Sequence, residues 1–164
     1  MTAAGENAEQ FRLLIRDLHS QVTPQTAGRI GAEFERLTQY FLLHDRRYAD
    51  KFSYVELWDE WRRKPGPDKG VDIVAGAGGE VWAIKCKFYD DNTKITARDI
   101  LEFFEGVVIM LEYIPDKKVK LVLSTTALAL ADDVKKMLVD YEVETITRDI
   151  FETSRDVDWQ KKRP

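Results

Sequence analysis

The chain has 164 residues, enough for one domain with a hydrophobic core and too few for two of ordinary size. Its content of 44% hydrophobic and 33% charged residues excludes a disordered chain. The apolar stretches are far shorter than the roughly 20 residues that cross a bilayer, and the N-terminus lacks the pattern of a secretory signal. Cys86 is the single cysteine, which excludes an internal disulfide and a Cys-rich zinc site. We therefore expect a cytoplasmic protein without membrane contact.

The net charge of -4 is unusual for a protein that binds nucleic acid, because phosphate binding normally requires a basic surface. Basic residues nevertheless gather locally, at Arg62–Lys64, Lys85 with Lys87, Lys117–Lys120 and Lys161–Arg163. Each cluster is either ordinary solvated surface or a place where phosphate binds. The charge balance alone does not decide between them.

In the first half of the chain, helical spacing of apolar residues and then strand-like alternation predict five elements. They are helices over Ala8–Leu18 and Thr26–Tyr48 and strands over Tyr54–Trp58, Val71–Ala75 and Glu80–Phe88. Turn-forming residues fill the segment from Lys64 to Gly70. Gly76, Gly78 and Gly79 predict a hairpin turn between the last two strands.

In the second half, helices and strands alternate. The pattern predicts a helix over Ile95–Tyr113, a strand over Lys118–Thr125, a helix over Ala127–Asp140 and a strand over Val143–Thr147. Ser124–Thr126 are expected to end their strand and cap the helix that follows. From Arg148 onward the chain is polar, with room for a short helix. A hairpin followed by alternating helices and strands predicts an α/β fold, with a mixed central sheet flanked by helices on both faces.

Strand alternation separates two kinds of residue on the strand over Glu80–Phe88. Its even-numbered residues from Trp82 to Phe88 are apolar and face the core, whereas Lys85 and Lys87 share the other face. A lysine on a central strand requires a carboxylate or an anion to compensate its charge.

Asp72 occupies the matching place on the preceding strand, although aspartate is unfavourable among β-branched strand residues. A hairpin would bring Asp72 and Lys87 together on one face. This pair is either a buried structural ion pair or part of a metal and water site, in which a carboxylate holds Mg²⁺ and a lysine stabilises developing charge. The spacing leaves both interpretations open.

Three short motifs occur in order along the chain: Gly31-Ala32-Glu33-Phe34-Glu35, Gly70-Val71-Asp72 and Lys85-Cys86-Lys87. Together they resemble the PD-(D/E)xK nucleases, and within them the Mrr-like restriction endonucleases, over roughly residues 27–147. The sequence around the last two motifs resembles in particular the N-terminal nuclease domain of the type ISP restriction–modification enzymes. The resemblance implies a restriction-endonuclease-like fold divided into an N-terminal helix (1–25), a nuclease domain (26–150) and a polar tail (151–164), the tail serving as a linker to a helicase-like domain.

The resemblance also implies an activity, the Mg²⁺- or Mn²⁺-dependent hydrolysis of double-stranded DNA in phage defence, with helicase or translocase and methyltransferase domains as partners in a longer chain. Asp72 would be the central metal ligand, and Glu35 and Asp68 would add carboxylates. The backbone carbonyl of Cys86 would be a further ligand, and Lys87 would be the catalytic lysine near the attacking water.

Lys85 departs from the family pattern, which has glutamine or glutamate at this position. A charged lysine has no acceptor atom and would repel a divalent metal. Three outcomes are open: Lys85 turns toward Glu35 or Asp68 and leaves a weakened metal site, it takes the place of the metal, or it is a substitution that silences a toxic nuclease. The alternative function is therefore a catalytically inactive nuclease fold that binds DNA or docks. A junction resolvase would share the chemistry and differ in substrate.

We expect the two histidines and the four tryptophans to have structural roles. His19 and His44 lack the spacing of paired ligands, so we expect surface or helix-packing positions. The tryptophans Trp58, Trp61, Trp82 and Trp159 are expected to pack in the core.

Overall fold

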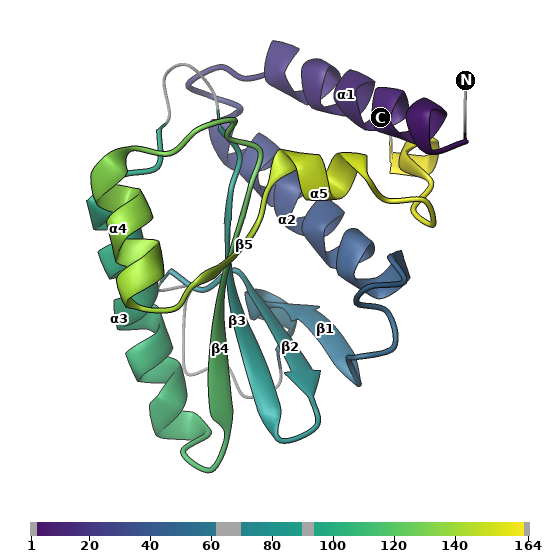
Figure 1. Cartoon of the computed structure of the whole chain (residues 1–164). Coiled ribbons are helices and arrows are strands. Elements are labelled where there is room, and N and C mark those ends of the chain that lie inside the picture. The colour runs from purple at the N-terminus through teal and green to yellow at the C-terminus, as the bar shows by residue number, and fades with distance from the viewer. Residues whose placement is uncertain (1–2, 62–69, 90–93, 163–164) are drawn as a thin grey trace.

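The computed structural model describes residues 3–61, 70–89 and 94–162 (Figure 1). Five strands form one sheet in the order β1-β2-β3-β4-β5. They are β1 (Tyr54–Leu57), β2 (Ile73–Ala77), β3 (Glu80–Lys87), β4 (Lys118–Thr125) and β5 (Glu144–Ile146). The helices are α1 (Ala3–Ser20), α2 (Ala27–His44), α3 (Ala97–Tyr113), α4 (Asp132–Asp140) and α5 (Arg148–Glu152), with short 3₁₀ turns η1 (Trp58–Glu60) and η2 (Trp159–Lys162).

The sheet is mixed, which confirms the predicted α/β fold class. Strands β1, β2 and β3 pair antiparallel, whereas β3, β4 and β5 pair parallel through the crossover helices α3 and α4. Because parallel strands end on the same side, Lys87 pairs with Thr125, and Ser124 pairs with Ile146. We call this side, marked by Lys87, Thr125 and Ile146, the carboxyl edge of the sheet.

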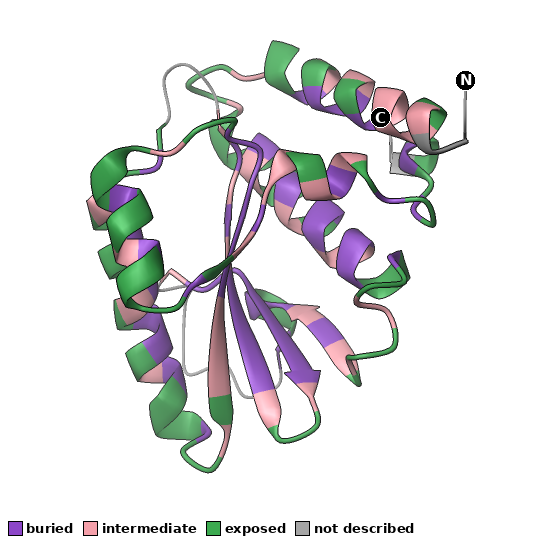
Figure 2. Ribbon diagram, in the orientation of Figure 1, coloured by how far each residue is buried: buried purple, intermediate pink, exposed green. Residues whose placement is uncertain are grey.

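Helices cover both faces of the sheet (Figure 1). The first, second and fifth helices lie on one face, and α3 and α4 lie on the other. Each face of the sheet packs into its own hydrophobic core, and alternate residues of β3 contribute to the two cores. Trp82, Ile84 and Cys86 belong to the first core, with α1, α2 and α5, and Val81 and Ala83 belong to the second, with α3 and α4. Figure 2 shows the resulting buried stripes on the inward sides of the helices and along the central strands. Burial of these stripes is the main stabilising contribution to the fold.

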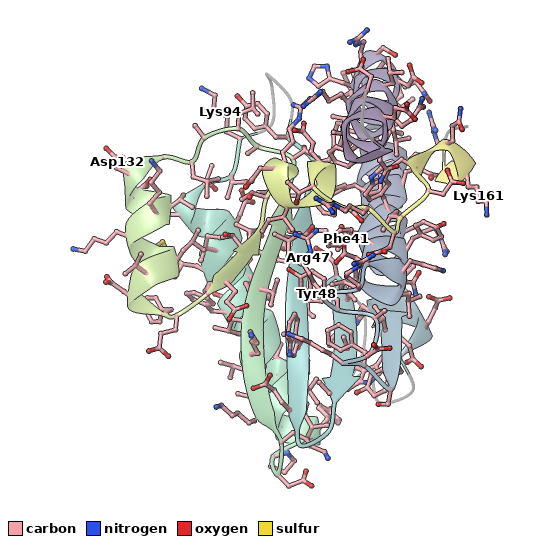
Figure 3. All side chains as sticks on the ribbon, turned by 45° about the vertical axis from the view of Figure 1, so that its right-hand side comes forward. Phe41, Arg47, Tyr48, Lys94, Asp132 and Lys161 are labelled. Atoms are coloured by element: carbon pink, nitrogen blue, oxygen red, sulfur yellow. The ribbon has the colours of Figure 1, made fainter. Side chains whose placement is uncertain are left out.

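The C-terminal segment packs into the first core. Phe151 and Trp159 are fully buried, and their rings contact Phe11 of α1 and Phe41 of α2 at centroid distances of 4.7 to 6.1 Å. Figure 3 shows Phe41 and Arg47 beside α5, where the Arg47 guanidinium donates to the Ile150 carbonyl at 2.9 Å. The polar tail predicted from residue 151 thus contains core residues, and the predicted N-terminal helix shares one core with the predicted nuclease domain.

Several predicted boundaries shift. The second helix ends at His44 and not near Tyr48, since the chain turns at Asp45. The turn between β2 and β3 consists of Gly78 and Gly79, and Gly76 lies within β2 against the ring of Tyr54. The predicted turn segment over residues 64–69 lies outside the described residues.

The predicted structural roles of the tryptophans and histidines hold. All four tryptophans are buried, with exposed fractions of 0 to 4%. His44 is exposed and its ring contacts that of Tyr40 within α2 at a centroid distance of 4.1 Å, and His19 is exposed at the end of α1. None of the described helices is long and apolar enough to cross a membrane.

Candidate active site

The register of β2 and β3 places Asp72 beside Lys85. Asp72 immediately precedes β2, and its N–H donates to the carbonyl of Ile84 at 2.9 Å, so the strand ladder continues to this residue. Its carboxylate is 4% exposed and accepts the backbone N–H of Cys86 at 2.7 Å. The Nζ of Lys85 lies 3.6 Å from the same oxygen, Oδ2. Asp72 is therefore held by the backbone of β3 and paired with a cation.

Gly70 has a structural reason to precede Asp72. Its φ of +113° is a conformation that residues with a side chain rarely adopt. A Cβ atom at this position would lie within 2.8 Å of the carbonyl carbon of Glu102 in α3. The glycine of the Gly-x-Asp motif thus lets the chain pass against α3 and enter β2 with Asp72 in place.

Lys87, at the carboxyl edge, pairs with a carboxylate that the sequence did not single out. Its Nζ lies 3.6 Å from Oδ1 of Asp99 in the first turn of α3. Asp99 also accepts the N–H of Thr96 at 2.8 Å in a capping box. Burial works to raise the pKa of Asp99, but the Thr96 hydrogen bonds and the charges of Lys87 and Lys85 outweigh it and lower the pKa. The Thr96-x-x-Asp99 pattern was the available signal, although it indicates only a helix start.

Two threonines fix the end of β3. Thr125 donates its hydroxyl to the carbonyl of Lys87 at 2.9 Å, and the hydroxyl of Thr126 accepts the N–H of Tyr89 at 2.9 Å. The helix cap predicted for Ser124–Thr126 is wrong, because α4 begins only at Asp132, with Ala131 as its N-cap. These hydroxyls instead hold the backbone that carries Lys87.

Helix α2 forms the opposite wall of the site. A cavity of about 280 Å³ separates its N-terminal half from the ends of β2 and β3. Ala27, Gly28, Gly31 and Ala32 give this wall a small-residue surface, and Glu35 adds a carboxylate. Across the cavity lie Asp72, Lys85, Cys86, Lys87 and Phe88.

The pKa of the Cys86 thiol is affected by the carboxylates around it. Burial is the largest reason why its pKa is raised well above the ordinary value, and the negative charges of Asp72 and Glu35 raise it further. The thiol itself faces the first core, as alternation predicted. Both carboxylates therefore lie within electrostatic reach of one point on β3.

The structure brings together most of the predicted site residues. Glu35, Asp72, Lys85, Cys86 and Lys87 all line this cavity, whereas Asp68 lies outside the described residues. The pairing differs from the prediction in one respect. Asp72 is paired with Lys85, and Lys87 lies two residues further along β3 with Asp99 as its partner.

The residues of this cavity do not fit the divalent metal that the resemblance implies. The carboxylates of Asp72 and Glu35 and the carbonyl of Cys86 are oxygen donors of the kind that Mg²⁺ prefers. However, the Lys85 ammonium stands 3.6 Å from the Asp72 carboxylate. At about 4 Å and an effective dielectric of about 20, each pair of unit charges costs about 4 kcal/mol, so a divalent ion here would be strongly repelled. No group of three or more metal-ligating side chains occurs among the described residues.

Residues 43–164 match the family model described as restriction endonuclease. The chain belongs to the Mrr-like restriction endonucleases. The matched part of this Mrr-like domain contains Asp72, Lys85 and Lys87, whereas α1 and Glu35 precede it.

Among solved structures, the Mrr-like domain is similar to the MspJI restriction endonuclease in complex with a 27-mer oligonucleotide, with 12% identity and a TM-score of 0.45. The similarity covers 90% of this chain and 30% of that chain. The comparison with curated proteins found no match.

Proposed function

We propose that this Mrr-like domain is the part of a restriction enzyme that hydrolyses phosphodiester bonds of double-stranded DNA, and that Lys85 suppresses the hydrolysis. The observation that carries the proposal is the position of the Lys85 ammonium, 3.6 Å from the Asp72 carboxylate in a cavity shared with Lys87 and Glu35. The cavity unites the residues that the family pattern requires and adds a cation where the pattern has an oxygen donor.

The basic side chains of the cavity suit a DNA phosphate. The side chains of Lys87 and Lys85 are 24% and 20% exposed, so both line the cavity and remain partly accessible to solvent. Lysine binds phosphate as a compact point charge with three donors. Asp99 holds Lys87 in place, and the small residues of α2 allow a bulky sugar–phosphate backbone to approach β3.

The metal belongs to the site only after Lys85 is replaced. Glutamine has the reach to fill the same space without a charge, and its amide oxygen is an acceptor. In the Lys85→Gln variant we expect Asp72, Glu35 and the carbonyl of Cys86 to hold Mg²⁺ or Mn²⁺, which would polarise the phosphate and activate water. Asp68 remains a proposed further ligand.

The family resemblance also supports a larger setting. We propose that a helicase-like translocase and a methyltransferase accompany this domain in a longer cytoplasmic restriction–modification protein of the type ISP kind. In that setting the accompanying domains would choose the DNA sequence and bring the duplex to the cavity.

A second function is favoured by the same lysine. With Lys85 in place, the domain would bind DNA through its basic residues without cutting it, and would serve the larger protein as a binding or docking module. The two functions differ in one measurable property, since only a suppressed nuclease recovers cleavage when residue 85 changes.

The test is nicking of supercoiled plasmid in Mg²⁺ and in Mn²⁺ by the parent chain and by Lys85→Gln. We expect the parent to be inactive and the variant to convert plasmid to the open-circular form. Lys118→Gln is the matched control, because it makes the same substitution at the exposed opposite end of the sheet. Equal cutting by parent and variant would show that Lys85 does not suppress the site. Failure of both, with DNA binding retained, would favour the binding module.

A further inference from the structure

A basic surface adjoins the active-site cavity on α1 and the first residue of α5. A depression of about 380 Å³ is lined by Arg12, Ile15, Arg16, His19, Ser20 and Arg148. Three of these six residues are arginines, and none is acidic. We call Arg12, Arg16, His19 and Arg148 the arginine strip.

The arginine strip reaches the active site at one end. The ring of His19 lies 6.3 Å from that of Phe88, centroid to centroid, and Phe88 lines the active-site cavity next to Lys87. Val22, two residues beyond α1, lines the same cavity. At the other side, Arg148 follows the end of β5, so it leaves the sheet at the carboxyl edge, where β3 also ends. The strip therefore adjoins the wall of the cavity through His19 and Phe88.

The strip carries more positive charge than its neighbours compensate. Arg12 and Arg148 share one carboxylate, Glu152, at 3.4 Å each, and Arg12 also pairs with Glu9 at 3.5 Å. Arg16 is exposed and forms no ion pair with any described residue. Three arginines thus face two carboxylates, which leaves one positive charge in excess on a chain whose net charge is -4.

We propose that the arginine strip binds the phosphates of duplex DNA that flank the scissile bond and directs one strand into the cavity at Lys87. This rests on the proposed function and goes beyond it, because α1 precedes the part of the chain that matches the family. Arginine is suited to phosphate by its planar set of donors. From residue 12 to residue 19, α1 rises about 10 Å, which corresponds to about three nucleotides of one strand at 3.4 Å each.

The test measures binding of a fluorescein-labelled 30-bp duplex to the full chain by anisotropy, without divalent metal and from low to physiological salt. We expect Arg16→Glu to weaken binding roughly tenfold at low salt, and Arg16→Ala to reduce the slope of log K against log salt by about 1, since one phosphate contact is lost. Lys118→Glu is the control, because it makes the same charge change at the exposed opposite end of the sheet. We expect it to bind as the parent does, and all variants to keep the parent melting temperature.

Two results would overturn the arginine strip: parent-like binding by Arg16→Glu, or an equal loss in Lys118→Glu. Absence of duplex binding by the parent would also overturn it, as would stronger Arg16-dependent binding to duplex RNA of the same sequence. The proposed function fails separately. If Lys85→Gln does not nick plasmid but Arg16→Glu still weakens duplex binding, the nuclease proposal falls and the strip stands. If Lys85→Gln nicks plasmid at the same rate with and without Arg16→Glu, the strip falls and the nuclease stands.

Discussion

Two buried aspartates, Asp45 and Asp72, are each paired with a cation, and their surroundings differ. Asp45 is 1% exposed and follows α2 directly. Its Oδ1 and Oδ2 accept the Arg47 guanidinium at 2.8 and 3.0 Å, and Oδ1 also accepts the Arg47 N–H at 2.9 Å. Burial works to raise the pKa of Asp45, but hydrogen bonds from Arg47 and Ser154 outweigh it and lower the pKa.

Asp72 is 4% exposed, yet its cation lies farther away, at 3.6 Å, and is a lysine. The charged groups around it come from separate elements: Glu35 from α2, Lys85 and Lys87 from β3, and Asp99 from α3. By contrast, the cation paired with Asp45 is Arg47, which lies only two residues further along the chain.

The comparison teaches how to tell a structural carboxylate from a functional one in this fold. A short, bidentate pair formed within one turn stabilises the chain path, here the turn that α5 covers. Charges of both signs that converge from three elements on a cavity are costly for stability and useful for binding a charged substrate. The two aspartates should therefore respond differently to substitution.

The largest effect on stability is expected at Asp45. Asp45→Ala would leave the partly exposed guanidinium of Arg47 without its carboxylate and the Arg47 N–H without its acceptor. We therefore expect the free energy of unfolding to fall by about 3 kcal/mol. Urea denaturation followed by circular dichroism measures it. Asp156→Ala is the control, because Asp156 pairs with Arg46, whose side chain is 74% exposed, and should cost clearly less stability than Asp45→Ala. Equal losses would remove the distinction between a buried and a surface pair.

The next effect concerns the glycine that places Asp72. Gly70→Ala should cost about 2 kcal/mol, from the positive φ and from contact with the backbone of Glu102. Gly78→Ala is the control that separates the effect of the positive φ from that of the contact with Glu102. Gly78 also has a positive φ, +66°, but a Cβ atom there would enter open space. We expect Gly78→Ala to cost about half as much in the same unfolding assay. If Gly78→Ala costs as much or more, close approach to α3 is not the reason for glycine in the motif.

At Asp72, substitution should separate stability from function. Asn can still accept the Cys86 N–H, so Asp72→Asn should change the free energy of unfolding by less than about 1 kcal/mol. In the Lys85→Gln background, the same change should abolish plasmid nicking. A loss of stability as large as that of Asp45→Ala would identify the Asp72–Lys85 pair as structural.

The smallest effect is a pH dependence. Because the folded-state pKa of Asp45 is lowered, its contribution to stability is complete above the unfolded pKa of about 3.9 and is lost as the pH falls through the folded value. The difference in unfolding free energy between the parent and Asp45→Asn should therefore be constant near neutral pH and shrink below about pH 4. A difference that stays constant through this range would contradict the lowered pKa.

The sequence predicted the mixed sheet from local patterns, and alternation on β3 separated Cys86 from the two lysines. Alternation also singled out Asp72 and Lys87, whereas Glu35 was selected only by the family resemblance. The pairing of Asp72 with Lys85 depends on strand register, which single-strand patterns do not contain. Asp99 was missed because the Thr96-x-x-Asp99 pattern indicates only the start of a helix and gives no sign of the pairing with Lys87. The tail was predicted as polar because Phe151 and Trp159 are isolated among charged residues, and only the fold shows that they fill one core.

The most direct test of the central claim, that Lys85 takes the place of the metal, is calorimetric titration of Mn²⁺ into the parent, Lys85→Gln and Lys85→Gln/Asp72→Asn. We predict no binding by the parent, one site in the single variant, and loss of that site in the double variant. Binding by the parent as tight as that of Lys85→Gln would contradict the account, because the ammonium beside Asp72 would then not exclude the ion.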